Sequence, residues 1–184
     1  MEFGEDILKI VEYARDEAMR TGHYGVSQDH LVLGMIRLGG NSGADTLAAL
    51  GIDLKDMKNA MDQAMMRPSS IPYEEINEVR LSESSRNAMN LGAVEAIKDG
   101  RDKVDARDLL TGICRGTGSL AKNYLAVHGI SAASISGAAA RNEKRESMQA
   151  LPLAEDIASA LEAEIRTILR DNGPQNKKNN TPFS

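Results

Sequence analysis

The sequence contains few of the residues on which many functional sites depend. Among its 184 residues there is no Trp, aromatic residues make up 3%, and Cys114 is the single cysteine. One cysteine cannot form an internal disulfide or a zinc cluster of several thiolates. A core without large aromatic side chains has to be built from aliphatic residues and methionine, which suits close packing of helices. The lack of a disulfide fits a reducing compartment, and we expect a cytoplasmic protein.

Long apolar runs and an excess of positive charge are missing as well. No run of about 18 apolar residues is present, and no basic region followed by an apolar stretch stands at the N-terminus. The formal net charge is -5 and the pI is about 5.3, with Lys and Arg scattered along the chain. We therefore expect neither a membrane nor a nucleic acid as partner.

The sequence contains one module twice. The stretch from Gly25 to Gly40 returns at an offset of 78 residues, from Lys103 to Gly118, with five identical positions. The same offset pairs further identical residues on both sides: Glu17 and Ala18 with Glu95 and Ala96, Gly22 with Gly100, and Gly51 and Ile52 with Gly129 and Ile130. A register that holds without gaps over this length indicates an internal duplication.

The first copy is predicted to begin with two helices. Apolar residues between Ile7 and Ala18 recur with the spacing of one helix face, and Gly22 can end that helix in the left-handed conformation. Ser27 is the predicted N-cap of the next helix. Because this second helix is apolar on nearly all sides, we expect it in the centre of the fold.

Two further helices complete the predicted first copy. Ser42 is expected to open a third helix through a capping box with Asp45, and Asp53 to cap a fourth. The fourth helix has a face of apolar residues, three of them methionines: Leu54, Met57, Met61, Ala64 and Met65. Met57, Met61, Met65 and the next residue, Met66, are expected in the core, the alternative being an adaptable peptide-binding groove. The second copy repeats the order, with Ser82, Asp105 and Ser119 as predicted caps.

These patterns predict an all-α fold of two tandem, pseudo-symmetric four-helix repeats. We expect repeat one over 3–67, repeat two over 81–145, and between them a linker over 68–80 that has two prolines and no helical period. The double-repeat domain then spans 1–146. Residues 147–184 are predicted to form a C-terminal helix from Pro152 onward and a disordered polar tail. No segment shows convincing strand alternation.

The doubled pattern resembles the Clp amino-terminal repeat domain. The resemblance covers about residues 3 to 145 and rests on the two copies, on "SQDHLVLGMI" (27–36) and on "LAALGID" (47–53). In that family such domains precede the ATPase modules of protein-unfolding chaperones, and they receive substrates and adaptors. The resemblance implies a non-enzymatic recognition or adaptor module with protein partners, acting in ATP-dependent Clp proteolysis or protein quality control. The alternative is a regulatory or structural interaction domain that reuses the fold without any link to proteolysis.

The sequence offers no convergent set of catalytic groups. It has no match to the phosphate-binding pattern G-x-x-x-x-G-K-[ST], so we expect no enzyme activity and no cofactor. Ser27, Asp29 and His30 have the residue types of a hydrolase triad, but on one helix turn the histidine cannot lie between the other two. His23 and His30 lack a third metal ligand, and we expect no metal. Instead, His30 is predicted to bond the backbone where its helix starts.

The resemblance also indicates candidate binding residues. Some family members bind phosphorylated arginine through a hydroxyl near the start of the first helix and a carboxylate just before the His-Leu-Leu stretch of the second, in each repeat. By position these roles fall to Gly4 and Asp29 in repeat one and to Ser82 and Arg107 in repeat two. Each repeat keeps only one of the two groups, since Gly4 has no hydroxyl and Arg107 would repel a guanidinium. The candidate partner-binding residues are therefore Asp29, Ser82 and Arg107.

Overall fold

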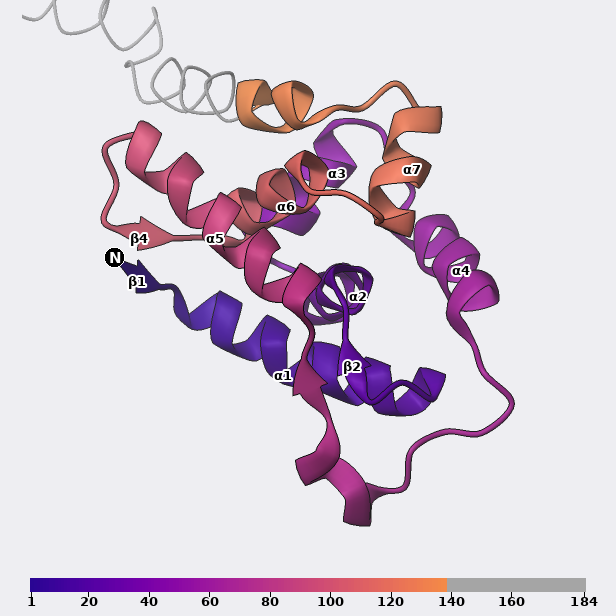
Figure 1. Cartoon of the computed structure of the whole chain (residues 1–184). Helices are drawn as coiled ribbons and strands as arrows, with labels where there is room; N and C mark the ends of the chain where they lie inside the picture. The colour runs from indigo at the N-terminus through magenta and orange to yellow at the C-terminus, as the bar shows by residue number, and fades with distance from the viewer. Residues whose placement is uncertain (139–184) are drawn as a thin grey trace, which may run out of the picture. The chain divides into compact units, whose positions relative to one another are not determined.

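Figure 1 shows the computed structural model of the chain, which describes residues 1–138. The first half holds α1 (Glu5–Thr21), α2 (Gln28–Leu38), α3 (Ser42–Ala49) and α4 (Leu54–Met65), and the second holds α5 (Glu83–Lys98), α6 (Ala106–Arg115) and α7 (Leu120–Val127). A further helical segment begins at Ala132. Each helix of the second half starts 78 residues after its counterpart, which confirms the all-helical fold and the duplication. The domain end at 146 and the predicted C-terminal helix and tail lie outside the described residues.

Four two-residue strands connect the repeats. β1 (Glu2–Phe3) pairs in parallel with β4 (Lys103–Val104), and β2 (Gly25–Val26) pairs in parallel with β3 (Arg80–Leu81). Each pair takes one strand from each repeat, and the 78-residue offset relates the two pairs. The expectation of no strands was wrong because two residues are too few to show alternation. The predicted linker also contains a 3-10 helix, η1 (Tyr73–Glu78).

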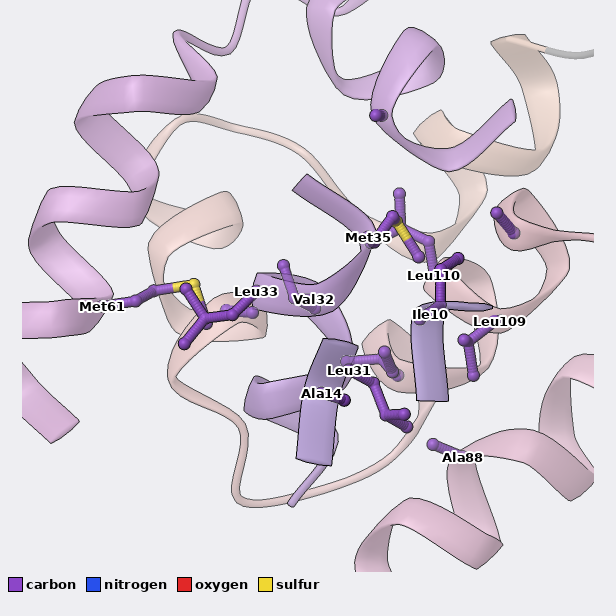
Figure 2. Packing of buried hydrophobic residues seen from close by; sticks show 14 of the residues in the cluster. Ile10, Ala14, Leu31, Val32, Leu33, Met35, Met61, Ala88, Leu109 and Leu110 are labelled. Atoms are coloured by element: carbon purple, nitrogen blue, oxygen red, sulfur yellow. The ribbon is translucent and has the colours of Figure 1, made fainter. Parts of the chain in front are cut away.

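The core lies where α1 and α5 pack against α2 and α6. Figure 2 shows side chains that meet there from different helices: Ile10 and Ala14 of α1, Leu31, Val32, Leu33 and Met35 of α2, Met61 of α4, Ala88 of α5, and Leu109 and Leu110 of α6. All ten are buried, and α2 is buried on nearly all sides, as predicted. The core of the described residues is aliphatic and methionine-rich, which also confirms the prediction.

Two glycines set the closest helix contacts. A Cβ on Gly34 would lie 2.5 Å from the carbonyl oxygen of Ile10, and a Cβ on Gly112 would lie 2.3 Å from that of Ala88. Both distances are far below an ordinary contact, so any larger residue would push the helices apart. Because the two contacts are equivalent under the offset, the shared glycines explain why α2 packs on α1 as α6 packs on α5.

Most predicted helix starts are confirmed. The N-caps of α2, α4, α5, α6 and α7 are Ser27, Asp53, Ser82, Asp105 and Ser119. The prediction for α3 was wrong by one residue: Asn41 is the cap, and its side chain accepts a hydrogen bond from the Ala44 N–H at 3.0 Å. Asn and Ser are equally good caps, so sequence alone does not separate them. The Ser42 hydroxyl instead accepts a hydrogen bond from the backbone N–H of Arg107 at 3.0 Å.

The methionines of α4 support the core. Met57, Met61 and Met65 are buried, whereas the next residue, Met66, is exposed. The core-packing prediction is therefore confirmed for Met57, Met61 and Met65 and was wrong for Met66.

Candidate functional site

Two pseudo-equivalent surfaces lie at the starts of α1 and α5. Each is built from both repeats, because the exchanged strands bring the start of α1 beside α6 and the start of α5 beside α2 (Figure 1). At the first, a carboxylate oxygen of Asp6 accepts a hydrogen bond from the N–H of Ala106 at 3.2 Å. At the second, the Ser82 N–H donates to the Val26 carbonyl at 3.0 Å, and the Ser85 hydroxyl donates to the same carbonyl.

Because the strands pair between the repeats, the predicted residues are grouped differently from the prediction. The start of α2, with Asp29, lies at the C-terminal end of α1, where His30 meets Thr21 at 3.0 Å, and not at the end that carries Gly4. Grouping Gly4 with Asp29 and Ser82 with Arg107 was therefore wrong. Ser82 shares a surface with the helix of Asp29, and Gly4 shares one with the helix of Arg107. Ser82 and the start of the helix that carries Asp29 thus lie at one surface, and Gly4 and the start of the helix that carries Arg107 lie at the other.

The surface at Ser82 carries a polar pocket. The pocket has a volume of about 290 Å³ and is lined by Gln28, Glu83, Ser84, Asn87 and Thr117. The Gln28 side-chain amide donates to the Thr117 carbonyl at 2.6 Å and fixes one wall. Ser82 itself accepts a hydrogen bond from the Ser85 N–H at 3.2 Å, so its hydroxyl caps α5.

Asp29 has a role within the fold. It is 6% exposed, and its Oδ1 accepts hydrogen bonds from the Ser119 hydroxyl at 2.8 Å and from the Ala121 N–H at 2.9 Å. The carboxylate thus fixes the start of α7. The local sequence around Asp29 gives no signal of this long-range contact. Binding of a partner by Asp29 stays a prediction, and such a partner would compete with these two hydrogen bonds.

The surface at Gly4 carries a pocket of mixed charge. Its volume is about 440 Å³, and its lining residues are Gly4, Glu5, Asp6, Arg101, Lys103, Val104 and Asp105. Arg107 lies beside it with its side chain 16% exposed and its guanidinium 3.6 Å from the Asp105 carboxylate. A role of Arg107 in binding also stays a prediction.

His30 has the structural role predicted for it. Its Nδ1 accepts a hydrogen bond from the Ser27 N–H at 2.9 Å, and its Nε2 lies 3.0 Å from the Thr21 hydroxyl. That hydroxyl donates to the Glu17 carbonyl, which assigns the ring proton to Nε2. Burial, followed by the nearby charges of His23 and the arginines Arg20 and Arg67, lowers the pKa of His30 to about 4. The ring is therefore neutral near pH 7.

The second repeat uses ions at the same positions. The counterparts of Thr21, His23 and His30 are Asp99, Arg101 and Asp108. Arg101 donates two hydrogen bonds to Asp108, at 2.7 and 2.6 Å, and a third to Asp99 at 3.0 Å. Asp108 Oδ2 accepts from the Asp105 N–H at 3.0 Å, as His30 does from Ser27. Hydrogen bonds from Arg101 to Asp108 raise the pKa of the arginine.

A buried glutamate recurs in both repeats. Glu17 pairs with Arg20 and Arg37, and its counterpart Glu95 pairs with Lys98 and Arg115, which occupy the equivalent positions. Burial alone would raise the pKa of Glu95, but hydrogen bonds from the two cations lower it below its ordinary value. These ion pairs connect α1 with α2 and α5 with α6.

The remaining candidate groups are also internal. Burial raises the pKa of the Cys114 thiol to about 11, which leaves little thiolate at neutral pH. His23 lies 3.1 Å from the Thr21 hydroxyl, and burial and Arg67 lower its pKa. Among residues 1–138, no cluster of three or more His, Cys, Asp or Glu side chains could hold a metal ion. In the same part of the chain, no helix has the length and apolar character needed to cross a membrane.

Similar solved structures share this fold. The N-terminal domain of the chaperone ClpD from Arabidopsis thaliana superimposes with a TM-score of 0.59 at 15% identity, covering 78% of this chain and 95% of that one. A chain solved in structural work on a malarial protein secretion system gives a TM-score of 0.63 at 15% identity, covering 82% and 98%. At this level of identity the likeness concerns the fold alone.

Sequence relatives are longer proteins. The chloroplastic chaperone ClpC3 of Oryza sativa subsp. japonica is 28% identical over 128 residues, 67% of this chain and 13% of the relative. Chloroplastic ClpC1 of the same plant is 30% identical over 113 residues, 61% of this chain and 12% of the relative. The chain thus spans 12–13% of these relatives. A family model described as the Clp repeat (R) N-terminal domain matches residues 2–128, more than half of the chain. The chain therefore belongs to the Clp repeat N-terminal domain family.

Proposed function

We propose that this chain is a non-enzymatic recognition module that binds proteins, namely clients, adaptors or Clp components, in ATP-dependent Clp proteolysis or protein quality control. The observation that carries the proposal is the doubled Clp repeat, whose relatives include proteins named as chaperones and as an ATP-binding subunit of the ATP-dependent Clp protease. We also propose a cytoplasmic location, which fractionation of the source cells would test.

The surface at Ser82 supports a recognition role more than the surface at Gly4 does. It has a polar pocket of about 290 Å³ in which uncharged hydrogen-bonding groups lie beside the acidic Glu83, and one lining residue, Gln28, belongs to the helix of Asp29. Polar groups arranged in this way suit a peptide that carries a cationic side chain. The partner-binding residues in this proposal are Ser82 and Asp29, with Arg107 disfavouring the same ligand at the other surface.

The proposal that the module is not an enzyme is supported by how its reactive groups are used. His30 bonds the backbone of Ser27 and the hydroxyl of Thr21, and Cys114 is buried with a raised pKa. Neither group faces either of the two pockets as a lining residue. Calorimetry with ATP and magnesium should give no binding heat, and micromolar affinity would contradict this part of the proposal.

Affinity capture from the source cells tests the link to proteolysis. Tagged wild-type chain should enrich Clp ATPase or protease subunits, or their adaptors and clients, and purified components should then bind it directly. Ser82→Ala should reduce the enrichment, while Asp45→Ala, at an exposed position of α3, should leave it unchanged. Direct binding to proteins unrelated to proteolysis, with no Clp component enriched, would favour the alternative of a regulatory or structural interaction domain.

A further inference from the structure

The C-terminal ends of α1 and α5 are equivalent parts of the two repeats but are covered differently. At the end of α1, the extended segment Arg67–Ile71, which we call the strap, lies across the last turn. The Arg67 N–H donates to the Thr21 carbonyl at 3.1 Å, and the Ile71 N–H donates to the Met19 carbonyl at 2.8 Å. Figure 1 shows this part of the chain leaving α4 and passing the end of α1. The strap thus binds carbonyl groups in the turn where a helix lacks its own donors.

The strap also covers an apolar side chain and a glycine. Met19 is only 8% exposed, and Ile71 packs partly buried against the core cluster. Gly22, which ends α1, is so close that a Cβ on it would lie 2.3 Å from the Ser69 carbonyl oxygen. An extended segment with an aliphatic residue therefore fits this turn closely.

Among residues 1–138, no segment covers the corresponding surface on α5. Ile97, the counterpart of Met19, is 61% exposed, and Val94, one turn earlier on the same helix face, is 43% exposed. A Cβ on Gly100, the counterpart of Gly22, would meet no atom of the described part of the chain within 4 Å. Two neighbouring aliphatic side chains are thus exposed at the position where the strap covers the first repeat.

We propose that the C-terminal end of α5 binds an extended segment of a partner protein, in the way that the strap binds α1. The segment would place an aliphatic residue over Ile97 and Val94 and direct backbone N–H groups to the carbonyls of the last turn. A basic residue four positions earlier would correspond to Arg67. One carboxylate favours it, since Asp102 stands where the first repeat has the neutral Tyr24, whereas Asp99 is already bound by Arg101 at 3.0 Å.

The sequence explains why the aliphatic residue should come from a partner. The strap, "RPSSI" (67–71), corresponds at the 78-residue offset to "RESMQ" (145–149), which has Gln149 in place of Ile71 and Glu146 in place of Pro68. At the position of Ile71, whose side chain lies against the core cluster, the second copy therefore has a polar residue. The surface at Ile97 is also at the opposite end of α5 from Ser82, so the proposal does not depend on a role in proteolysis.

The strap provides the probe for a test. A synthetic peptide with the sequence of residues 66–72, MRPSSIP, is titrated into the full chain and followed by amide chemical shifts in NMR. We expect saturable shifts over residues 94–101, and no saturable shifts with a peptide in which the isoleucine is replaced by Asp. Absence of saturable binding, or shifts centred on 19–22 instead, would overturn the proposal.

Matched variants locate the binding surface. Ile97→Asp and Val94→Asp should each weaken peptide binding by about tenfold or more, because a carboxylate replaces the apolar contact. Leu8→Asp is the control, since Leu8 on α1 is similarly exposed, at 59%. All three positions are exposed, so thermal melts should show that the variants remain folded. Equal peptide affinity for the Ile97→Asp and Leu8→Asp variants would show that the proposal is wrong.

Discussion

Positions 21, 23 and 30 of the first repeat hold Thr, His and His, whereas the equivalent positions 99, 101 and 108 of the second hold Asp, Arg and Asp. Both sets do the same work: they give the N-cap residue of a central helix an acceptor for its N–H, and they tie that helix to the end of the preceding one. The first set does so with neutral groups and the second with ions. We call each set of three residues a helix joint. The two joints have the same geometry, so the fold accepts either neutral or ionic groups there, provided that the three residues change together.

The largest expected effect comes from breaking the ionic joint. Asp108→Ala removes the partner of a bidentate arginine and the acceptor of the Asp105 N–H. We expect the free energy of unfolding to fall by about 3 to 5 kcal/mol, because Asp108 is buried and its loss leaves polar groups unpaired. Urea denaturation measures this. Asp102→Ala, at an exposed position, is the control and should change stability by less than about 0.5 kcal/mol.

The next effect should distinguish the neutral joint by its response to acid. The folded pKa of His30, about 4, lies below the value of 6.5 for a free histidine, so the unfolded chain binds the proton more readily. His30 therefore contributes stability that is complete above pH 6.5 and is lost as the pH falls toward 4, by roughly 3 kcal/mol. The measurement compares wild type with His30→Asn at pH 7 and pH 4. An acid loss of equal size in both proteins would contradict the assignment.

A smaller effect is expected in partner binding, where the crossed surfaces predict asymmetry. If the surface at Ser82 binds a peptide with a cationic side chain, Asp29→Ala should weaken binding by about 1 to 3 kcal/mol, the range for losing a charged hydrogen bond. Arg107→Ala should leave the affinity nearly unchanged. Calorimetry with a phosphoarginine peptide and its unphosphorylated form measures both. Because Asp29 also holds α7, a melting curve must accompany each titration, and a stronger loss for Arg107→Ala would reverse the assignment of the two surfaces.

The smallest effect is expected when the two joints are exchanged. The triple variant Thr21→Asp, His23→Arg, His30→Asp gives the first repeat the side chains of the second. Its stability at pH 7 should lie within about 1 kcal/mol of wild type, because the residues replaced act as one unit. The single change Thr21→Asp should cost more than the triple variant. If the triple variant is the less stable of the two, the three positions do not form an interchangeable set.

The repeats, their helices and the nature of the core could be predicted because they depend on local signals. Apolar spacing, caps such as Ser27 and Ser82, and the ungapped offset all lie within a few turns of the residues they specify. The crossed arrangement could not be predicted, since no local feature shows that β1 pairs with β4. The role of Asp29 was missed for the same reason, because its hydrogen-bond partner Ser119 is 90 residues away.

The contact between His30 and Thr21 could have been predicted from a difference between the two repeats. Aligning the repeats at the offset places Thr21, His23 and His30 opposite two acids and one arginine. When three positions all change from neutral to charged residues, contact among the three side chains is a better explanation than independent substitutions at the surface. A comparison of the copies for such coordinated differences, in addition to identities, would have found the joint.

The strand pairing between the repeats has a consequence for a single repeat on its own. A single repeat released from its copy would present an unpaired strand and an unpaired strand acceptor, and two such molecules could satisfy each other by the pairings seen between β1 and β4 and between β2 and β3. Such a pair would be a homodimer with a true twofold axis, in which neither subunit is complete alone. In a homodimer every substitution occurs in both halves, whereas in one chain each half can change separately, as His30 and Asp108 do at equivalent positions.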